Sequence, residues 1–469
     1  MNNLRSVCLF LTLPACGFAQ ATFSPARVSN LPIAPVPQVA SKPAGATATP
    51  MGPQATVPQN PTGPSATLSL KDAQGLALKN NPQISVARLT ALASLQVTRE
   101  VRSSLWPTAT VDLTAVDANP GTRLTAGALN NPILYQRAAA GAMVSQLLTD
   151  FGRTMNLISS ANLAAKAENQ NALATKEQIL LAVDQAFYNS LQAQAVLTVA
   201  QQTVKERQTV ADQVGALFQS KLKSGLDFSF ANVNLAQAKL LLLDAQNNQN
   251  AALATLSAVL GFSNLQTFQL VEDPAPNLPP PGNVDDLINT AFSMRPEILS
   301  FEFQSESARK FQTAERDLLF PDIHALGVVG DTPVRNPIIS NWYGAVGVNV
   351  DIPVFNGFLY PARAKEASLR AQAAQERLRD LRDRISRDVR TSWLNATTAY
   401  NRLAVTQQLL EQANLALNLA QSRYNLGLGS IVELSQAQLQ QTQAEITNAE
   451  AGYDYRLSLA VLQYQTSGI

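Results

Sequence analysis

The chain has 469 residues, and 35 Lys and Arg face 34 Asp and Glu, which gives a formal net charge of +1. This balance provides no general electrostatic attraction to nucleic acid or to an acidic partner. The single His, His324, and the two Cys, Cys8 and Cys16, leave almost no basis for a His/Cys metal site or a His-dependent triad. With no nucleophile–base pair or Gly-rich phosphate loop in view, we expect neither an enzyme nor a cofactor.

The N-terminus reads as an export signal. Residues 1–21 combine Arg5, the short apolar run Val7 to Leu13, and an A-x-A cleavage site ending at Ala21. A lipobox ending at Cys16 is the alternative, and it would leave Cys16 as an acylated N-terminus. No later run reaches the ~18 apolar residues of a membrane helix, so any later membrane span must be a β-barrel.

Residues 22–66 are rich in Pro, Ala, Thr and Gln. Such a segment cannot bury a core, so we expect a disordered tether. A second Pro-rich stretch, 273–283, is predicted to connect two halves of the chain.

The first half, 67–272, begins with a helical pattern that stops at Pro107. Strict alternation from Thr110 to Ala115 predicts a strand, and a weaker strand follows over 139–148. Gly152 then opens a helical pattern of about 70 residues, on the order of 100 Å at 1.5 Å per residue.

The second half, 284–469, repeats this order. Pro107 has its counterpart in Pro321, 214 positions later, and Gly152 is matched by Gly357. Strands are predicted from His324 to Gly330 and from Trp342 to Ile352. The internal repeat therefore predicts two units of the same fold.

Each half ends in a pattern that steps by seven residues, the period of a coiled coil. Ala231, Ala238 and Ala245 form one such series, and Ala437, Ala444 and Ala451, which lie 199 positions after Ala238, Ala245 and Ala252, form the other. Each series is predicted to be the return arm of a long helical hairpin.

The turns of these hairpins carry capping residues. Gly427 is predicted at the left-handed C′ position that ends a helix, and Ser430 with Glu433 as a capping box. In the first hairpin we expect Gly225 as the C-cap and Asp227 as the N-cap.

The number and length of the predicted strands imply that the chain forms an oligomer. Each half contributes about two strands of roughly ten residues, which is the length that crosses a bilayer when tilted. Four strands cannot close a barrel, and an open edge in lipid leaves backbone groups unsatisfied. Because an eight-stranded barrel is filled by its own side chains, a conducting pore favours three copies over two.

From residue 68 to 466 the chain resembles the TolC-like outer-membrane efflux and secretion channels. The motifs that carry the resemblance are Leu68 to Ala73 with Asn80-Asn81-Pro82, and Arg423 to Gly427 with Glu433 to Ala437. The resemblance implies a mainly α fold, a homotrimeric α-helical barrel continuous with a 12-stranded β-barrel in outer-membrane lipid. It also implies a tunnel through the periplasm whose tips meet an adaptor protein, joined to an inner-membrane transporter of the RND, ABC or MFS class.

The resemblance also assigns the hairpin turns to a periplasmic gate. The gate positions fall on Glu433 and Gln436, with Asn234 near the corresponding place in the first half. Since Gln436 and Asn234 are neutral, a strong acidic ring is in doubt, and the capping box alone also explains Glu433. The turn residues expected to dock the adaptor are Lys221, Lys223, Gly225, Arg423, Tyr424 and Gly427, although cations in a last helical turn also favour the helix dipole.

The function expected is a passive exit duct for small molecules or proteins. The alternative is a periplasmic coiled-coil adaptor or structural protein that is not a channel. An adaptor needs one hairpin inside a split β-domain, whereas this chain carries two hairpins, each after two strands of membrane-crossing length.

Overall fold

The computed structural model describes residues 67–117, 119, 137–266, 268–272, 280–332, 338 and 340–466. The predicted signal peptide, the tether, Cys16 and most of the Pro-rich connector lie outside the described residues. Residues 62–469 form one compact unit, to which the description below applies.

Each repeat begins with two helices joined at an Asn-Pro or Arg-Pro step. They are α1 (Leu70–Asn80) and α2 (Pro82–Ser103) in the first repeat, and α5 (Val284–Met294) and α6 (Pro296–Arg316) in the second. Pro stands at the first position of both α2 and α6, where its missing N–H costs nothing. A short 3₁₀ helix, Asp317–Leu319, follows α6.

The long helices are α3 (Arg153–Gln219) and α7 (Leu359–Asn425), and each has 67 residues. Their return arms are α4 (Gly225–Val259) and α8 (Ile431–Thr466). A left-handed pair of residues precedes each long helix, Phe151-Gly152 in one repeat and Gly357-Phe358 in the other. The predicted helix-opening glycines therefore lie at the strand-to-helix junctions.

Four strands form one antiparallel sheet in the order β2-β3-β5-β6. They are β2 (Thr108–Val116), β3 (Arg137–Thr149), β5 (Asp322–Asp331) and β6 (Trp342–Asp351). Ala142 of β3 pairs with Val111 of β2 and with Val329 of β5, so the two repeats join through their inner strands. The outer strands β2 and β6 leave apolar side chains uncovered, with Leu113 80% and Val346 91% exposed.

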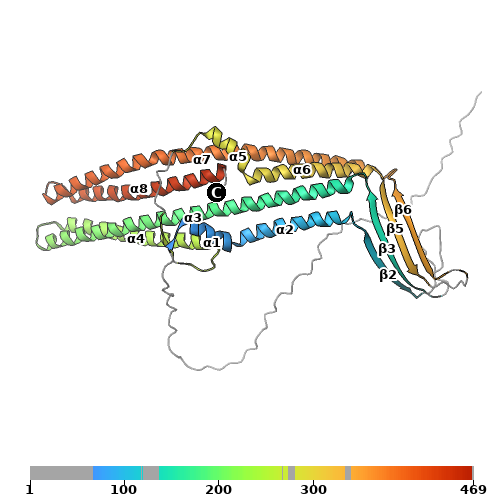
Figure 1. The fold of residues 1–469 in the computed structure, drawn as a ribbon. Coiled ribbons are helices and arrows are strands. Elements are labelled where there is room, and N and C mark those ends of the chain that lie inside the picture. The colour runs from blue at the N-terminus through green and yellow to red at the C-terminus, as the bar shows by residue number, and fades with distance from the viewer. Residues whose placement is uncertain are drawn as a thin grey trace, which may run out of the picture. The chain divides into compact units, whose positions relative to one another are not determined.

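The sheet lies at one end of the long helices, and both hairpin turns lie at the other end (Figure 1). A small parallel ladder was not predicted. It joins β1 (Thr67–Leu68) to β4 (Gln269–Leu270), and so ties the start of the first repeat to the segment after its hairpin. Two-residue strands carry too little pattern to be recognised in a sequence.

Small residues line the hairpin interfaces. Ala231, Ala238 and Ala245 of α4 are buried, and so are Ala437, Ala444 and Ala451 of α8, which confirms the seven-residue stripes as packing faces. Within the described ranges, none of the helices combines the length and apolar character needed to cross a membrane.

Candidate functional site

The first hairpin turn differs from its prediction. The left-handed residue that ends α3 is Lys221 (φ 64°), and its N–H donates to the Phe218 carbonyl at 2.9 Å. The Leu222 N–H donates to the Leu217 carbonyl at 2.9 Å, which completes a Schellman motif. Gly225 is therefore not the C-cap; it is the first residue of α4.

Asp227 is not the N-cap of α4 either. The N-cap is Ser224, whose Oγ accepts from the Asp227 N–H at 3.1 Å, while the Asp227 carboxylate accepts from the Ser224 N–H at 3.0 Å. The pair forms a complete capping box, which satisfies two amide donors at the helix start. The Ser-x-x-Asp spacing in the sequence was the signal that pointed to Ser224.

The second hairpin turn agrees with its prediction at Gly427. Its φ is 75°, and it lies at C′ of α7, with Leu428 N–H donating to the Arg423 carbonyl at 2.8 Å. Ser430 Oγ accepts from the Glu433 N–H at 3.1 Å, which is one half of the predicted capping box. The Glu433 carboxylate is paired instead with Arg423 Nε at 3.2 Å.

These caps fix the correspondence between the two turns. Ser430 lies 206 positions after Ser224, and Glu433 lies 206 positions after Asp227. The offset of 199 taken from the alanines is one heptad too short, because a seven-residue stripe matches itself equally well after a shift of seven. The first-repeat counterpart of Glu433 is therefore the acidic Asp227, and not a position near the neutral Asn234.

The two turns contact each other through Lys223 and Tyr424. The Lys223 ammonium lies 3.9 Å from the centre of the Tyr424 ring, within the range of a cation–π interaction. Tyr424 is buried, and its hydroxyl has no hydrogen-bond partner among the residues that the structure describes. Burial, followed by the nearby Asp227, raises its pKa. The ring packs with Val214, Leu235 and Leu434 in a core shared by both hairpins.

Asn234 and Gln436 occupy different surroundings. Asn234 Nδ2 donates to Ser435 Oγ at 2.7 Å, so this side chain links α4 to α8. Gln436 and Glu433 are exposed on the first turns of α8. Of the three predicted gate residues, the structure thus brings Glu433 and Gln436 to one surface and places Asn234 in the contact between hairpins.

A residue that the sequence analysis missed is Arg207 of α3. It is 5% exposed, and its Nη2 donates to the Gln438 carbonyl at 2.8 Å and to Thr442 Oγ1 at 3.0 Å. Burial lowers its pKa, against the opposing effect of Glu206 and Glu445. Arg207 stands in a heptad series with Ala200 and Val214, and a cation at a packing position was the signal available.

The tips also present apolar side chains to solvent. Leu222 and Leu226 of the first turn are 70% and 64% exposed, and Leu426 and Leu428 of the second are 74% and 70% exposed. Grouped large apolar side chains at a polar rim are typical of a protein-binding surface.

Comparison with known proteins covers both repeats. A family profile described as Outer membrane efflux protein matches residues 74–262 and 287–465. Outer membrane protein TolC of Escherichia coli K12 is 21% identical over 411 residues, 83% of this chain and 81% of that protein. Probable outer membrane lipoprotein SilC of Salmonella typhimurium is 23% identical over 383 residues, 78% of each. The CmeC outer membrane channel of Campylobacter jejuni has the same fold, with a TM-score of 0.74 at 17% identity over 88% of this chain and 90% of that one.

Proposed function

Because the chain belongs to the outer membrane efflux protein family, and is an outer-membrane efflux channel with a periplasmic helical part, we propose that it is the passive exit duct of a tripartite pump or a type I secretion system. Channels of this family are transporters and not enzymes, and they work as trimers with efflux pump components. The finer partners belong to the proposal: a periplasmic adaptor at the tips, and an inner-membrane RND, ABC or MFS transporter.

The observation that supports an assembly of several copies is a helix contact that the first repeat makes and the second repeat lacks. Helix α3 packs on α6, where Ser160 Oγ donates to the Ser307 carbonyl at 2.9 Å and Ser307 Oγ to the Ser160 carbonyl at 2.8 Å. The corresponding pair is α7 with α2, and these two helices do not pack on each other within the described part of the chain. A second copy is required to complete the pattern.

Exposure supports the same pairing. Leu163 of α3 is 9% exposed, whereas its counterpart Leu369 of α7 is 53% exposed. On α2, Val86 and Leu89 are 62% and 58% exposed. We expect Leu369 of one copy to face α2 of the next. Such a contact joins two different surfaces, so it closes a ring when the rotation allows.

The sheet follows the same logic. Its edge strands, β2 and β6, are both unpaired on one side within the described residues. Pairing β6 of one copy with β2 of the next leaves no free edge, and three copies then supply the predicted twelve strands. The boundaries proposed for the two repeats, 67–272 and 284–469, place one strand pair and one hairpin in each.

For the gate we propose Glu433 together with Asp227, each at the third position of its helix. Three copies would bring six carboxylates to the tips, with Gln436 next to them. Arg423 offsets part of the negative charge of Glu433, since the two side chains form an ion pair. For adaptor docking we propose the exposed turn leucines with Lys221. Lys223 is held on Tyr424, Gly427 provides the left-handed residue of its turn, and Gly225 begins α4. Cleavage after Ala21 and acylation of Cys16 both remain predictions for the N-terminus, and SilC is named as a lipoprotein.

Single-channel conductance of the purified, detergent-extracted protein in a planar bilayer tests the proposal. We expect uniform current steps, and a higher leak conductance in Glu433→Gln and in Asp227→Asn because each removes a carboxylate from the tips. Ser430→Ala is the matched control, since it removes the cap on the Glu433 N–H and keeps the charge.

Each possible result has a distinct meaning. An equal leak in Ser430→Ala would assign Glu433 to helix capping. The absence of current from folded oligomer, in the wild type and in all three variants, would contradict the duct itself.

A further inference from the structure

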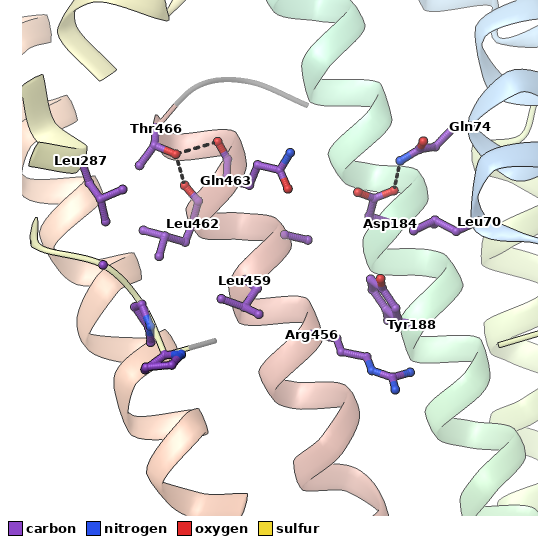
Figure 2. Close-up of a pocket in the computed structure, with 14 residues that line it drawn as sticks. Leu70, Gln74, Asp184, Tyr188, Leu287, Arg456, Leu459, Leu462, Gln463 and Thr466 are labelled. Atoms are coloured by element: carbon purple, nitrogen blue, oxygen red, sulfur yellow. Dashed lines mark hydrogen bonds between the residues drawn. The ribbon is translucent and has the colours of Figure 1, made fainter. Parts of the chain in front are cut away.

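A pocket of about 570 Å³ lies where the first repeat meets the C-terminal end of α8 (Figure 2). This end of α8 lies away from the hairpin turns (Figure 1). Helix α1 contributes Leu70 and Gln74, α3 contributes Asp184 and Tyr188, and α8 forms the facing wall. Residues 280–282 and Leu287 of α5 close one side. The volume is in the range of sites that hold a small organic molecule.

Asp184 is the charged group buried at this pocket. It is 5% exposed, and its Oδ1 accepts from Gln74 Nε2 at 2.7 Å. Burial raises the pKa of Asp184 to about 6, and the bond from Gln74 opposes that effect. At neutral pH the carboxylate is thus ionised, and among the described residues its hydrogen-bond partner is the neutral Gln74 amide and not a cation. A buried charge without a counter-charge is costly, and an incoming cation would offset that cost.

The other titratable groups at the pocket do not supply this counter-charge. Arg456 of α8 lines the pocket, but its guanidinium is ion-paired with Glu272 and lies 5.6 Å from the Tyr453 ring. The local charge of Asp184, Arg456 and Glu272 together is therefore negative.

The corresponding position of the second repeat carries a charge of opposite sign, and that charge is paired. The counterpart of Asp184, 206 positions later, is Arg390, and it lies 3.8 Å from Asp285 in an exposed ion pair. Of these two positions, Asp184 is the buried one, and it lines the pocket. The remaining walls of the pocket are largely apolar and are formed by Leu70, Leu287, Leu459 and Leu462.

We propose that this pocket binds a small organic cation, an ammonium group on an apolar body, with the ammonium at the Asp184 carboxylate and the body against the leucines. The inference goes beyond the exit duct and does not depend on the gate. The charge of the ligand follows from Asp184, its apolar body from the walls, and its size from the volume.

Calorimetry on the detergent-extracted full chain tests this, with hexylammonium as the probe and 1-hexanol as its neutral analogue. We expect saturable binding of hexylammonium at pH 8, and about tenfold weaker binding at pH 5, because a carboxyl with a pKa near 6 is about nine-tenths protonated there. Asp184→Asn is expected to weaken binding at least tenfold at pH 8. Glu177→Gln, the same change on α3 outside the pocket lining, is the control and should leave binding unchanged.

A second variant protects the test from a folding defect. Leu459→Trp fills the pocket and keeps Asp184, so it should abolish binding while circular dichroism shows the helices intact. The proposal fails if hexanol binds as tightly as hexylammonium, if Asp184→Asn binds like the wild type, or if no saturable binding occurs.

Discussion

The first hairpin, α3 with α4, and the second hairpin, α7 with α8, follow the same path and place their charges differently. Both long helices have 67 residues, and both turns close with the same pair of backbone hydrogen bonds. Yet the left-handed residue is Lys221 in one turn and Gly427 in the other. The repeat therefore preserves the backbone, while the side chains around it are free to diverge.

The seam between the hairpins shows the divergence most clearly. In the α3–α8 contact, Arg207 bonds to Gln438 and Thr442, and Gln192 Nε2 donates to Asp454 Oδ1 at 3.3 Å. The counterparts of these residues in α7 and α4 are Ala413, Asn232, Ala236, Thr398 and Asn248. Charged side chains thus occupy the seam inside one chain, and neutral ones occupy the equivalent surfaces of α7 and α4, which face each other in the ring of copies that we propose.

Among changes that disrupt the charged seam, Arg207→Ala is expected to have the largest effect on stability. It removes two buried charge-assisted hydrogen bonds across the seam, so we expect the free energy of unfolding to fall by about 2 kcal/mol. Urea denaturation of the detergent-extracted protein, followed by circular dichroism, measures it. Lys205→Ala, an exposed cation on the same helix, is the control. Equal losses in both variants would mean that Arg207 does not stabilise the seam.

A smaller effect is expected at the two left-handed turn residues, with opposite signs. A side chain in the left-handed region costs about 1–2 kcal/mol, so Gly427→Ala should lower the free energy of unfolding by about 1 kcal/mol. Lys221→Gly relieves that strain but raises the conformational entropy of the unfolded chain. We therefore expect the free energy of unfolding to rise by at most ~1 kcal/mol.

The same denaturation measurement checks both variants. Gly452, inside α8 with open space around it, is the control for a Gly→Ala change, and there stability should rise. A loss at Gly452 or a gain at Gly427 would contradict the assignment of strain to the turns.

The smallest effect concerns pH, because Glu177 is only partly buried and solvent screens its electrostatic interactions. Burial, followed by Glu297, raises the pKa of Glu177 from 4.5 to about 7, while Arg295 and Lys176 lower it. Because the folded pKa exceeds the unfolded one, the stabilisation is full below about pH 4.5 and is lost as the pH rises through 7. The thermal midpoint should therefore rise from pH 8 to pH 5, and Glu177→Gln should remove part of that rise. Asp383→Asn, at the exposed counterpart on α7, should leave it unchanged.

Local patterns predicted most of this fold. Alternation identified the strands, and seven-residue steps identified both return arms, because each pattern is written in neighbouring residues. The family assignment also followed from short motifs in their order, and it removes the alternative of an adaptor that is not a channel.

What the sequence did not predict depends on contacts between distant segments or on competing local signals. The partners of Arg207 and Asp184 lie on other helices, and the β1–β4 ladder joins segments about 200 residues apart. In the first turn, Gly225 and Asp227 were the predicted caps, whereas the hydrogen bonds make Ser224 the N-cap and Gly225 the first residue of α4. The alanine stripes repeat every seven residues and therefore match each other at several offsets. The helix caps are what determine the offset of 206 between the two repeats.

The equal length of the two long helices restricts how the gene can change. Adding residues to α3 alone would move one turn by about 1.5 Å per residue and rotate its packing face by about 100° each. Seven residues restore the face, so insertions and deletions should be tolerated only as whole heptads. Because both turns share one core, that heptad has to be added to the outgoing and the return arm of both hairpins. The helical part therefore lengthens in steps of about 10 Å, each needing four matched insertions.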